Sequence, residues 1–364
     1  MSNPTRAGFV RPPELFVLDD PGNARYDPDP LGLLSAREAL SAHYATLHRN
    51  VDPGRLVLCA STSEAYSWLF KIYCDPGDAV MVPKPGYPLF EHLACLESVQ
   101  TVPYRLEYVH PKGWRIDIEH LEDSIRQLGT RCKALILINP NNPTGSYIHE
   151  RERSSVIDLC ARHNLVLVVD EVFFDFSLER HPQQKSFMGT SEVLTLVLDG
   201  LSKRLGMPQM KLGWIAVAGP DDVCMKTMAR LELVADTFLS TGTPIMRALP
   251  GLLQHEQAFI EMVRTRMRQN YAIYHEVLEG AESPHRLLAC EGGWTALVES
   301  PAIADEESIA LRLLEDASLS IQPGFFFDME RGAHFALSLI LEPAVAREYA
   351  SRYVSCFQRM LMDV

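Results

Sequence analysis

The central part of the chain alternates short apolar runs with segments of helical pattern. Six apolar runs occur at 56–59, 79–82, 134–138, 165–169, 193–198 and 214–217. Each run is apolar at consecutive positions, which is typical of strands that are covered on both faces. Helical patterns lie between them, at 62–73, 88–97, 150–163 and 221–237. This alternation predicts an α/β fold with a mostly parallel sheet covered by helices.

The two ends of the chain differ from this central part. Residues 1–30 are rich in Pro, Asp and Gly and predict an irregular arm, and a helical stripe begins at Leu33. A helical pattern at 256–279 precedes strand signals at 292–298, 319–322 and 334–340 and a helix near 305–316. We therefore predict an arm over 1–30, a large domain over 31–255 and a small α+β domain over 256–364.

Charge and composition disfavour several classes of partner. The chain has 364 residues and a formal net charge of −13, which disfavours nucleic acid and anionic membranes because like charges repel. It has no long apolar run and no signal-peptide pattern at its start, so we expect a cytoplasmic protein without a membrane partner. Its eight cysteines are scattered and form no C-x-x-C pair, so we predict neither a disulfide framework nor a metal site.

Three polar residues follow three of the apolar runs. Asn142 comes after the third run, Asp170 directly after the fourth and Lys203 after the fifth. Their spacing corresponds to strand–helix units of roughly thirty residues, and the carboxyl ends of parallel strands share one edge of a sheet. Taken one at a time, these residues also fit a turn, a helix cap and a surface charge. It is their order that predicts a common site.

Several motifs in this order resemble the class I/II aminotransferases, pyridoxal-phosphate enzymes of fold type I. The motifs are YDPDPLG at 26–32, STSEA at 61–65, DPGD at 75–78, PKPGY at 83–87, NPNNPTG at 139–145, DEVF at 170–173 and SK at 202–203. They extend over nearly the whole chain. The resemblance implies a large domain that binds pyridoxal 5′-phosphate and a smaller α+β domain formed mainly by the C-terminal part.

The resemblance implies a role for each residue around the cofactor ring. Lys203 carries the cofactor as a Schiff base, is displaced by the substrate amine and then moves a proton between substrate and cofactor. Asp170 faces the pyridine nitrogen, and Tyr87 stacks on the ring. Asn142 donates to the phenolate oxygen and contributes to the substrate site.

A second group of residues is expected to hold the cofactor phosphate. Ser61, Thr62 and Ser63 come at the start of a helix with capping-box spacing, where backbone N–H groups and hydroxyls can bind an anion. In the resemblance, Lys211 stands where the family usually has a phosphate-binding arginine. Tyr26 matches a tyrosine that reaches the phosphate of the neighbouring subunit, which implies a homodimer with shared sites.

Some positions depart from the family pattern. Phe173 replaces a tyrosine that donates to the phenolate oxygen in many members, and Gly200 replaces a phosphate-binding serine. Ala336 stands where the family has the arginine that clamps the substrate α-carboxylate, and a methyl group cannot replace that cation. Either another arginine takes over, with Arg6 preferred to Arg331, or the substrate is not an ordinary α-amino acid. The family usually has a segment before the loop of Arg6, so the resemblance also implies a short N-terminus or an internal start.

These residues predict an aminotransferase that moves an amino group from an amino donor to a 2-oxo acid, by a ping-pong route through a pyridoxamine form. Two alternatives stay open. A β-lyase, a racemase or a cyclising synthase with the same cofactor needs the same anchor residues. A non-catalytic relative keeps only the fold, but such a protein has no physical need to retain Lys203, Asp170 and Asn142 together.

Overall fold

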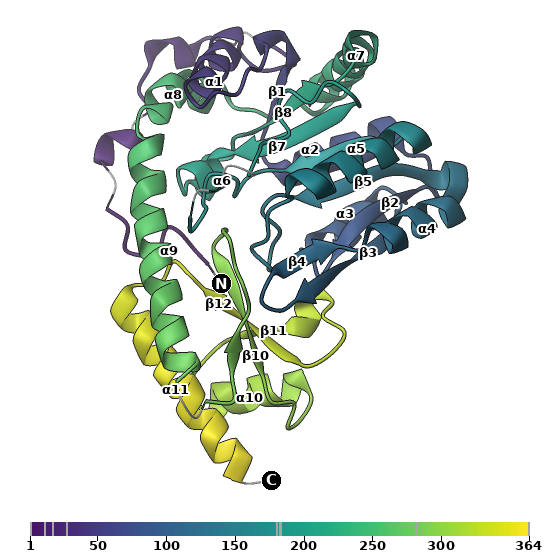
Figure 1. The fold of residues 1–364 in the computed structure, drawn as a ribbon. Coiled ribbons are helices and arrows are strands. Elements are labelled where there is room, and N and C mark those ends of the chain that lie inside the picture. Colours follow the sequence, from purple (N-terminus) through teal and green to yellow (C-terminus); the bar gives the residue numbers. More distant parts are fainter. Residues whose placement is uncertain are drawn as a thin grey trace.

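Two β-sheets organise the chain, one of eight strands and one of four (Figure 1). The structure is a computed structural model, and it describes residues 2–10, 12–16, 18–26, 28–179, 181, 184–280 and 283–362. None of the helices in these ranges is both long enough and apolar enough to cross a membrane.

The large sheet has the strand order β1-β8-β7-β6-β5-β2-β3-β4. Its strands are β1 (Leu56–Cys59), β2 (Ala79–Lys84), β3 (Gln100–Val109), β4 (Gly113–Ile116), β5 (Cys132–Ile138), β6 (Val166–Asp170), β7 (Thr195–Gly200) and β8 (Gly213–Ala218). The central strands from β7 to β3 pair in parallel, whereas β8, β1 and β4 pair antiparallel at the edges. The six predicted apolar runs are six of these strands, so the predicted mostly parallel sheet is confirmed.

Helices cover both faces of the large sheet. One face packs against α2 (Thr62–Tyr73), α3 (Leu89–Leu96) and α7 (Asp221–Phe238). The other face packs against α1 (Leu34–Thr46), α4 (Ile118–Leu128), α5 (Glu150–His163), α8 (Thr243–Leu253) and α9 (Glu256–Leu278). Successive residues of a strand point to opposite faces, so Val57 belongs to the first of these cores and Leu58 to the second. Every residue of β1 is therefore buried, as the unbroken apolar run predicted.

The small sheet is antiparallel, with the order β11-β12-β10-β9. Its strands are β9 (Arg286–Leu287), β10 (Thr295–Ser300), β11 (Gln322–Pro323) and β12 (Ala333–Ser338), and its helices are α10 (Glu306–Ala317) and α11 (Pro343–Met362). Phe335 of β12 meets the rings of Tyr353 and Phe357 of α11. In Figure 1 the long helix α9 extends from α8, beside the large sheet, to α11, beside the small one. The proposed domain boundary at 255/256 falls at the start of this helix and remains a prediction.

Single-turn helices complete the described chain. They are α6 (Leu201–Arg204) and the 3₁₀ turns Pro13–Phe16, Pro21–Ala24, Pro53–Arg55, Gly129–Arg131, Pro208–Met210 and Gly324–Phe327. The described parts of residues 1–30 contain two of these turns and no longer element.

Some predicted boundaries in the small sheet were wrong. The strand signal at 292–298 begins too early, because β10 starts at Thr295. Gly292 and Gly293 instead form a turn, since a Cβ on Gly292 would lie 2.6 Å from the carbonyl oxygen of Phe176 and Gly293 has a φ of 79°. The signal at 319–322 contributes only its last residue to β11. No predicted segment corresponded to β3, β4, β9, α4, α8 or α11.

Candidate active site

The carboxyl ends of three neighbouring strands bring the predicted polar residues to one edge of the large sheet. Strands β5, β6 and β7 are adjacent and parallel. Asn142 follows β5, Asp170 ends β6, and Lys203 lies in α6 directly after β7. The three residues therefore lie at the common edge where open α/β sheets bind their ligands.

Asp170 is a buried carboxylate with a hydrogen-bond donor on each oxygen. Its Oδ1 accepts from the backbone N–H of Val172 at 3.1 Å, and its Oδ2 accepts from the hydroxyl of Tyr66 at 3.3 Å. Burial raises the pKa of Asp170 to about 6, although both donors favour the ionised form. This carboxylate is therefore close to its titration point at neutral pH.

Lys203 is near Asp170 without forming an ion pair with it. Burial lowers the pKa of the Lys203 amine below its ordinary value, and the charge of Asp170 opposes this shift. The Nζ atom lies 5.5 Å from the ring centroids of both Phe173 and Trp294. Within the described ranges, no residue accepts a hydrogen bond from this amine. A lowered pKa enriches the neutral amine, which is the nucleophilic form.

Tyr87 and the NPNNPTG loop lie beside these two groups. Burial, together with the charge of Asp170, raises the pKa of Tyr87, yet the residue is 43% exposed and so also faces solvent. Asn141 rather than Asn142 makes the buried bonds of the loop: its Nδ2 donates to the carbonyl of Pro85 at 3.1 Å. Asn142 is half-buried, and its side chain has no hydrogen-bond partner in the described part of the chain. Its amide is therefore available to a ligand.

The N-terminus of α2 opens toward the same edge of the sheet. Ser61 caps the helix, with its hydroxyl accepting from the N–H of Glu64 at 3.2 Å. The Glu64 carboxylate accepts from the N–H of Ala60 at 2.6 Å, one residue earlier than in the predicted capping box. Thr62 and Ser63 occupy the first turn and are half-buried.

The position of Gly200 leaves little space for a side chain. A Cβ at this position would lie 3.0 Å from both the Cα of Gly213 and the carbonyl oxygen of Leu212. A Cβ on Gly213 would in turn lie 3.3 Å from the carbonyl carbon of Ser61. Because Gly200 and Gly213 have no side chain, the start of α2 can approach the last residue of β7 and the first residue of β8. Lys211 lies close by in sequence, with an exposed side chain and a φ of 52°.

Three further predicted residues have exposed side chains. Tyr26 is 79% exposed, and Arg6 and Arg331 are also exposed. In the described structure, none of these three side chains contacts Lys203 or Asp170.

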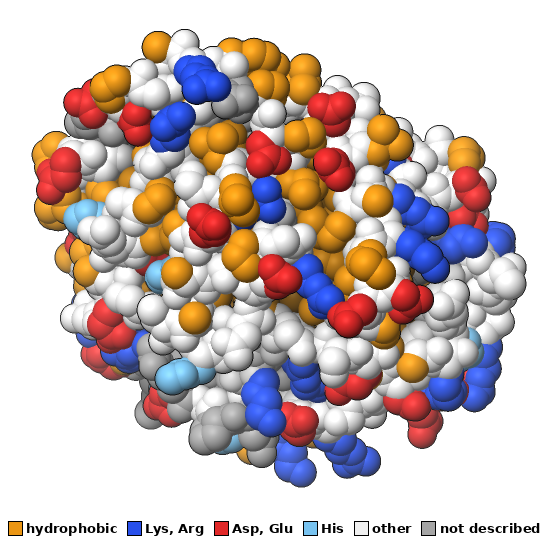
Figure 2. Space-filling model, turned by 90° about the horizontal axis from the view of Figure 1, so that it is seen from above, with side chains coloured by type: hydrophobic (Ala, Val, Ile, Leu, Met, Phe, Trp, Pro, Cys, Tyr) orange, Lys and Arg blue, Asp and Glu red, His pale blue; other side chains and the backbone are white. Residues whose placement is uncertain are grey.

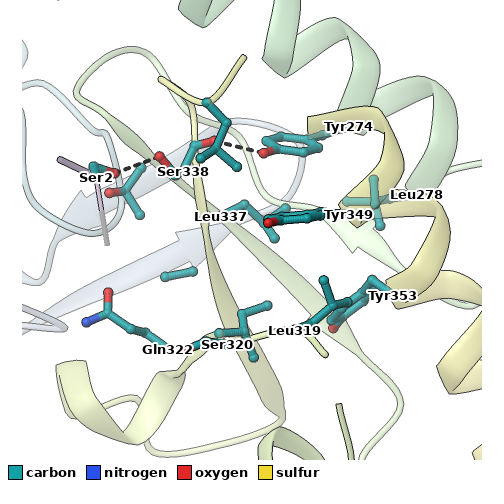
Figure 3. Close-up of a pocket in the computed structure, with 15 residues that line it drawn as sticks. Ser2, Tyr274, Leu278, Leu319, Ser320, Gln322, Leu337, Ser338, Tyr349 and Tyr353 are labelled. Atoms are coloured by element: carbon teal, nitrogen blue, oxygen red, sulfur yellow. Dashed lines mark hydrogen bonds between the residues drawn. The ribbon is translucent and has the colours of Figure 1, made fainter. Parts of the chain in front are cut away.

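A small pocket lies beside Ala336 of β12, between the small sheet and helices α9 and α11 (Figure 3). It has a volume of about 130 Å³, and the described side chains that line it carry no charge. Ser2 donates either to Ser338 Oγ, at 2.9 Å, or to the carbonyl of Trp294, at 3.2 Å, and Tyr274 donates to the carbonyl of Ser338 at 2.8 Å. The pocket thus adjoins Trp294, whose ring lies beside Lys203, and it offers no counter-ion to a carboxylate.

Arg204, the residue after Lys203, is buried among three carboxylates. Its guanidinium donates to Asp199 at 2.5 Å, to Asp175 at 2.8 Å and to Glu256. Asp199 also accepts from the hydroxyl of Tyr44, at 2.9 Å. Because these carboxylates come from β7, the segment after β6 and the first turn of α9, they fix the position of the short helix that carries Lys203.

Sequence reasoning missed Tyr66 and Arg204. Tyr66 falls on the apolar face of a predicted helix, where a phenol hydroxyl needs a partner, and this signal was available. Arg204 lies between Lys203 and Leu205 in the segment GLSKRLGM, and its three partners are too distant in sequence to be recognised. Among the residues with a described placement, no group of three or more His, Cys, Asp or Glu side chains could hold a metal ion.

We predict that Asp170→Asn stabilises the cofactor-free protein at neutral pH. The pKa of about 6 in the folded state exceeds the ordinary value of about 3.9, so the free energy of unfolding falls as pH rises between these values. An amide does not titrate, so at about pH 8 the variant should gain roughly 2–3 kcal/mol over the native chain, and at about pH 4 almost nothing. Urea denaturation at both pH values measures this difference.

Asp175→Asn is the matched control. Burial alone would raise the pKa of Asp175, but the guanidinium groups of Arg204 and Arg49 hold it well below its usual range. This substitution should therefore destabilise the protein at neutral pH, in the opposite direction. A native chain as stable as Asp170→Asn at about pH 8 would show that burial of Asp170 carries no electrostatic cost.

Comparisons with known proteins agree with this geometry. A family model described as aminotransferase class I and II matches residues 11–335. Alanine aminotransferase of Mycobacterium tuberculosis (strain H37Rv) is 28% identical over 267 residues, which are 72% of this chain and 61% of that protein. Glutamate-pyruvate aminotransferase of Escherichia coli (strain K12) is 27% identical over 266 residues, 72% of this chain and 64% of that protein. The chain therefore spans less than two thirds of the length of these relatives.

Solved structures share the fold over almost the whole chain. Alanine aminotransferase from Pyrococcus furiosus superposes with a TM-score of 0.87 at 21% identity, covering 99% of this chain and 91% of that one. Tyrosine aminotransferase from Leishmania infantum gives a TM-score of 0.88 at 19% identity, with 99% and 90% covered. With the family match over most of its length, this chain belongs to the class I and II aminotransferases and has their fold type I architecture.

Proposed function

We propose that this protein is a pyridoxal-phosphate-dependent aminotransferase that moves an amino group from an amino donor to a 2-oxo acid. The observation that carries this proposal is the placement of Lys203 and Asp170. An amine of lowered pKa and a buried carboxylate lie at one sheet edge, near enough to interact but not paired. Membership of the aminotransferase family supports the same reaction class.

The residues present fit this cofactor. The site offers an amine for an aldehyde, a carboxylate for a ring nitrogen, an aromatic face for the ring and a helix N-terminus for a phosphate. The Lys203 amine and the Asn142 amide both lack a hydrogen-bond partner in the described chain, as expected of groups that bind a ligand. We assign these cofactor-binding residues: Lys203, Asp170, Asn142, Tyr87, Ser61, Thr62, Ser63 and Lys211, with Tyr26 reaching a second copy.

The reaction follows from what these side chains do. When bound, the cofactor supplies an electron sink for the carbon that bears the substrate amine. Lys203 Nζ takes the proton from this carbon, because its lowered pKa leaves part of the amine neutral. The Asp170 carboxylate holds positive charge at the ring nitrogen. The rings of Phe173 and Trp294 limit the access of water to the lysine.

We predict that borohydride reduction of the protein loaded with cofactor leaves a pyridoxyl group on Lys203. Peptide mass mapping locates the adduct, and Lys203→Ala should lose both the adduct and the visible absorbance. Lys226→Ala, which removes an exposed lysine of α7, is the control and should keep both. The native protein should also form pyruvate and glutamate from L-alanine and 2-oxoglutarate, the substrates suggested by the named relatives. Conversion of L-alanine to D-alanine without glutamate would instead favour a racemase. Catalytic release of pyruvate and ammonia from β-chloro-L-alanine, which has a leaving group on Cβ, without glutamate would favour a lyase.

We propose Arg6 as the cation for the substrate carboxylate. Position 336 offers only a methyl group, and Arg6 lies on the N-terminal segment whose Ser2 reaches Ser338 and Trp294. Arg6→Gln should raise the KM for L-alanine about tenfold, the effect of losing one charge-assisted hydrogen bond, with kcat little changed. Arg331→Gln is the matched control. A raised KM in that variant alone would transfer the role to Arg331, and an unchanged KM in both would assign the carboxylate to another group. A native protein that binds the cofactor but does not turn over L-alanine would indicate a different substrate.

We propose that the protein is a homodimer. Large apolar side chains are exposed on the arm, on α1 and at the end of α7: Tyr26, Leu34, Leu233, Phe238 and Leu239. Figure 2 views the molecule from the side where α1 and α7 lie and shows apolar side chains gathered there. Large exposed apolar side chains that share one side of a molecule are typical of a protein–protein contact, and a second copy of the chain is the commonest partner.

Sedimentation velocity tests this assembly. We expect the native protein to have twice the mass of one chain, and Leu239→Asp to shift it toward the monomer. Leu311→Asp, at an exposed leucine of α10, should leave the mass unchanged. A native protein that sediments as a single chain at micromolar concentration would contradict the proposed dimer.

A further inference from the structure

Tyr66 lies on the second turn of α2 and contacts Asp170 of the candidate site. Its hydroxyl donates to Asp170 Oδ2 at 3.3 Å, across 104 residues of sequence. Tyr66 is 3% exposed and Asp170 9%, so both groups are largely shielded from water. Together with the N–H of Val172 on Oδ1, this contact gives Asp170 one donor for each oxygen and so fixes its carboxyl plane.

The Tyr66 phenol is a hydrogen-bond donor at neutral pH. Burial raises the pKa of Tyr66 well above its ordinary value, and the charge of Asp170 raises it further. Proton transfer from Tyr66 to the carboxylate is therefore excluded near neutral pH. The Tyr66 hydroxyl can donate to Asp170 in both its ionised and its neutral form. The hydrogen bond is stronger when the carboxylate is ionised.

Aromatic neighbours hold the Tyr66 ring in place. It packs edge-to-face on Phe90, with 5.0 Å between ring centroids, and Phe90 packs edge-to-face on Tyr87 at 6.2 Å. Tyr66 also contacts Phe70 of its own helix, at 6.2 Å. A chain of three rings therefore connects the aromatic residue proposed to stack on the cofactor with the acid proposed to face its nitrogen.

We propose that Tyr66 is a positioning residue that keeps Asp170 ionised and aimed at the cofactor ring nitrogen. This inference rests on the proposed function. A proton shared between that nitrogen and Asp170 can reside on either partner. A hydrogen bond to the carboxylate stabilises the charged arrangement, in which the proton is on the nitrogen, because the donor interacts more strongly with a negative oxygen than with a neutral acid. Tyr66 thereby sets how much positive charge Asp170 maintains at the nitrogen.

Tyr66→Phe tests this role, because it removes one oxygen and keeps the ring that packs on Phe90. The enzyme is loaded with cofactor labelled with ¹⁵N in its ring, and the chemical shift of that nitrogen is measured by NMR. In the native enzyme the shift should be that of a protonated ring, and in Tyr66→Phe it should move toward the neutral value. The kcat for transamination should fall roughly 10- to 100-fold, the effect of one hydrogen bond to a charged group, with little change in KM.

Tyr104→Phe is the matched control. Tyr104 is likewise a buried tyrosine, at 1% exposure, but it lies in β3 and its hydroxyl donates to the backbone carbonyl of Ile136 at 3.0 Å. This variant makes the same chemical change without touching Asp170, so its ¹⁵N shift should equal that of the native enzyme. If Tyr66→Phe folds poorly, 4-aminophenylalanine in place of Tyr66 restores a donor on the same ring and should restore the native shift.

The possible outcomes separate this inference from the proposed function. A native protein without cofactor absorbance would overturn both. A native protein that binds the cofactor, with the same ¹⁵N shift in Tyr66→Phe as in the native enzyme, would overturn the role of Tyr66 alone. Equal displacement of the shift in Tyr66→Phe and Tyr104→Phe would also overturn it, because the effect would then come from general loosening of the sheet.

Discussion

The ion pairs of Arg204 are the interaction on which the candidate site depends. A guanidinium with 2% exposure is surrounded by carboxylates of three separate elements, and removal of one partner from such a buried pair typically costs about 3–5 kcal/mol. Lys203 precedes this arginine on a helix of four residues, which has too few internal hydrogen bonds to be rigid by itself. The cluster supplies that rigidity, so the position of the amine is determined by charges outside its own helix.

The same cluster links the two sheets. Glu256 is the first residue of α9, and its carboxylate is buried against Arg204 and His43 beside the large sheet. The far end of α9 packs beside α11 and the small sheet (Figure 1). A domain boundary placed at residue 256 therefore separates the first turn of α9 from the contacts that hold it. The helix belongs to both halves of the molecule, and this places the small sheet relative to Lys203.

Asp170 and Lys203 illustrate how a site differs from a core. Burial disfavours the charged form of each, and their mutual attraction does not cancel this effect, since the pKa of the acid is raised to about 6 and that of the amine is lowered. Elsewhere in the same region, Arg204 and Asp175 keep their charges because they are in direct contact. Titratable groups whose pKa values are shifted by burial in this way cluster at functional sites.

The sequence by itself determined six strands of the large sheet, several helices and the order of the polar residues at the sheet edge. Helices 62–73 and 150–163 have the predicted bounds, and each unbroken apolar run became a buried strand, because these patterns arise from neighbouring residues that share one environment. β3 was not predicted, since it has no unbroken apolar run and only Tyr104 and Leu106 of its ten residues are buried. Only the tertiary structure decided that Tyr66 meets Asp170 and that Arg204 meets three carboxylates. These partners are distant in sequence, and whether a buried charge is paired depends on which distant side chains the packing brings to it.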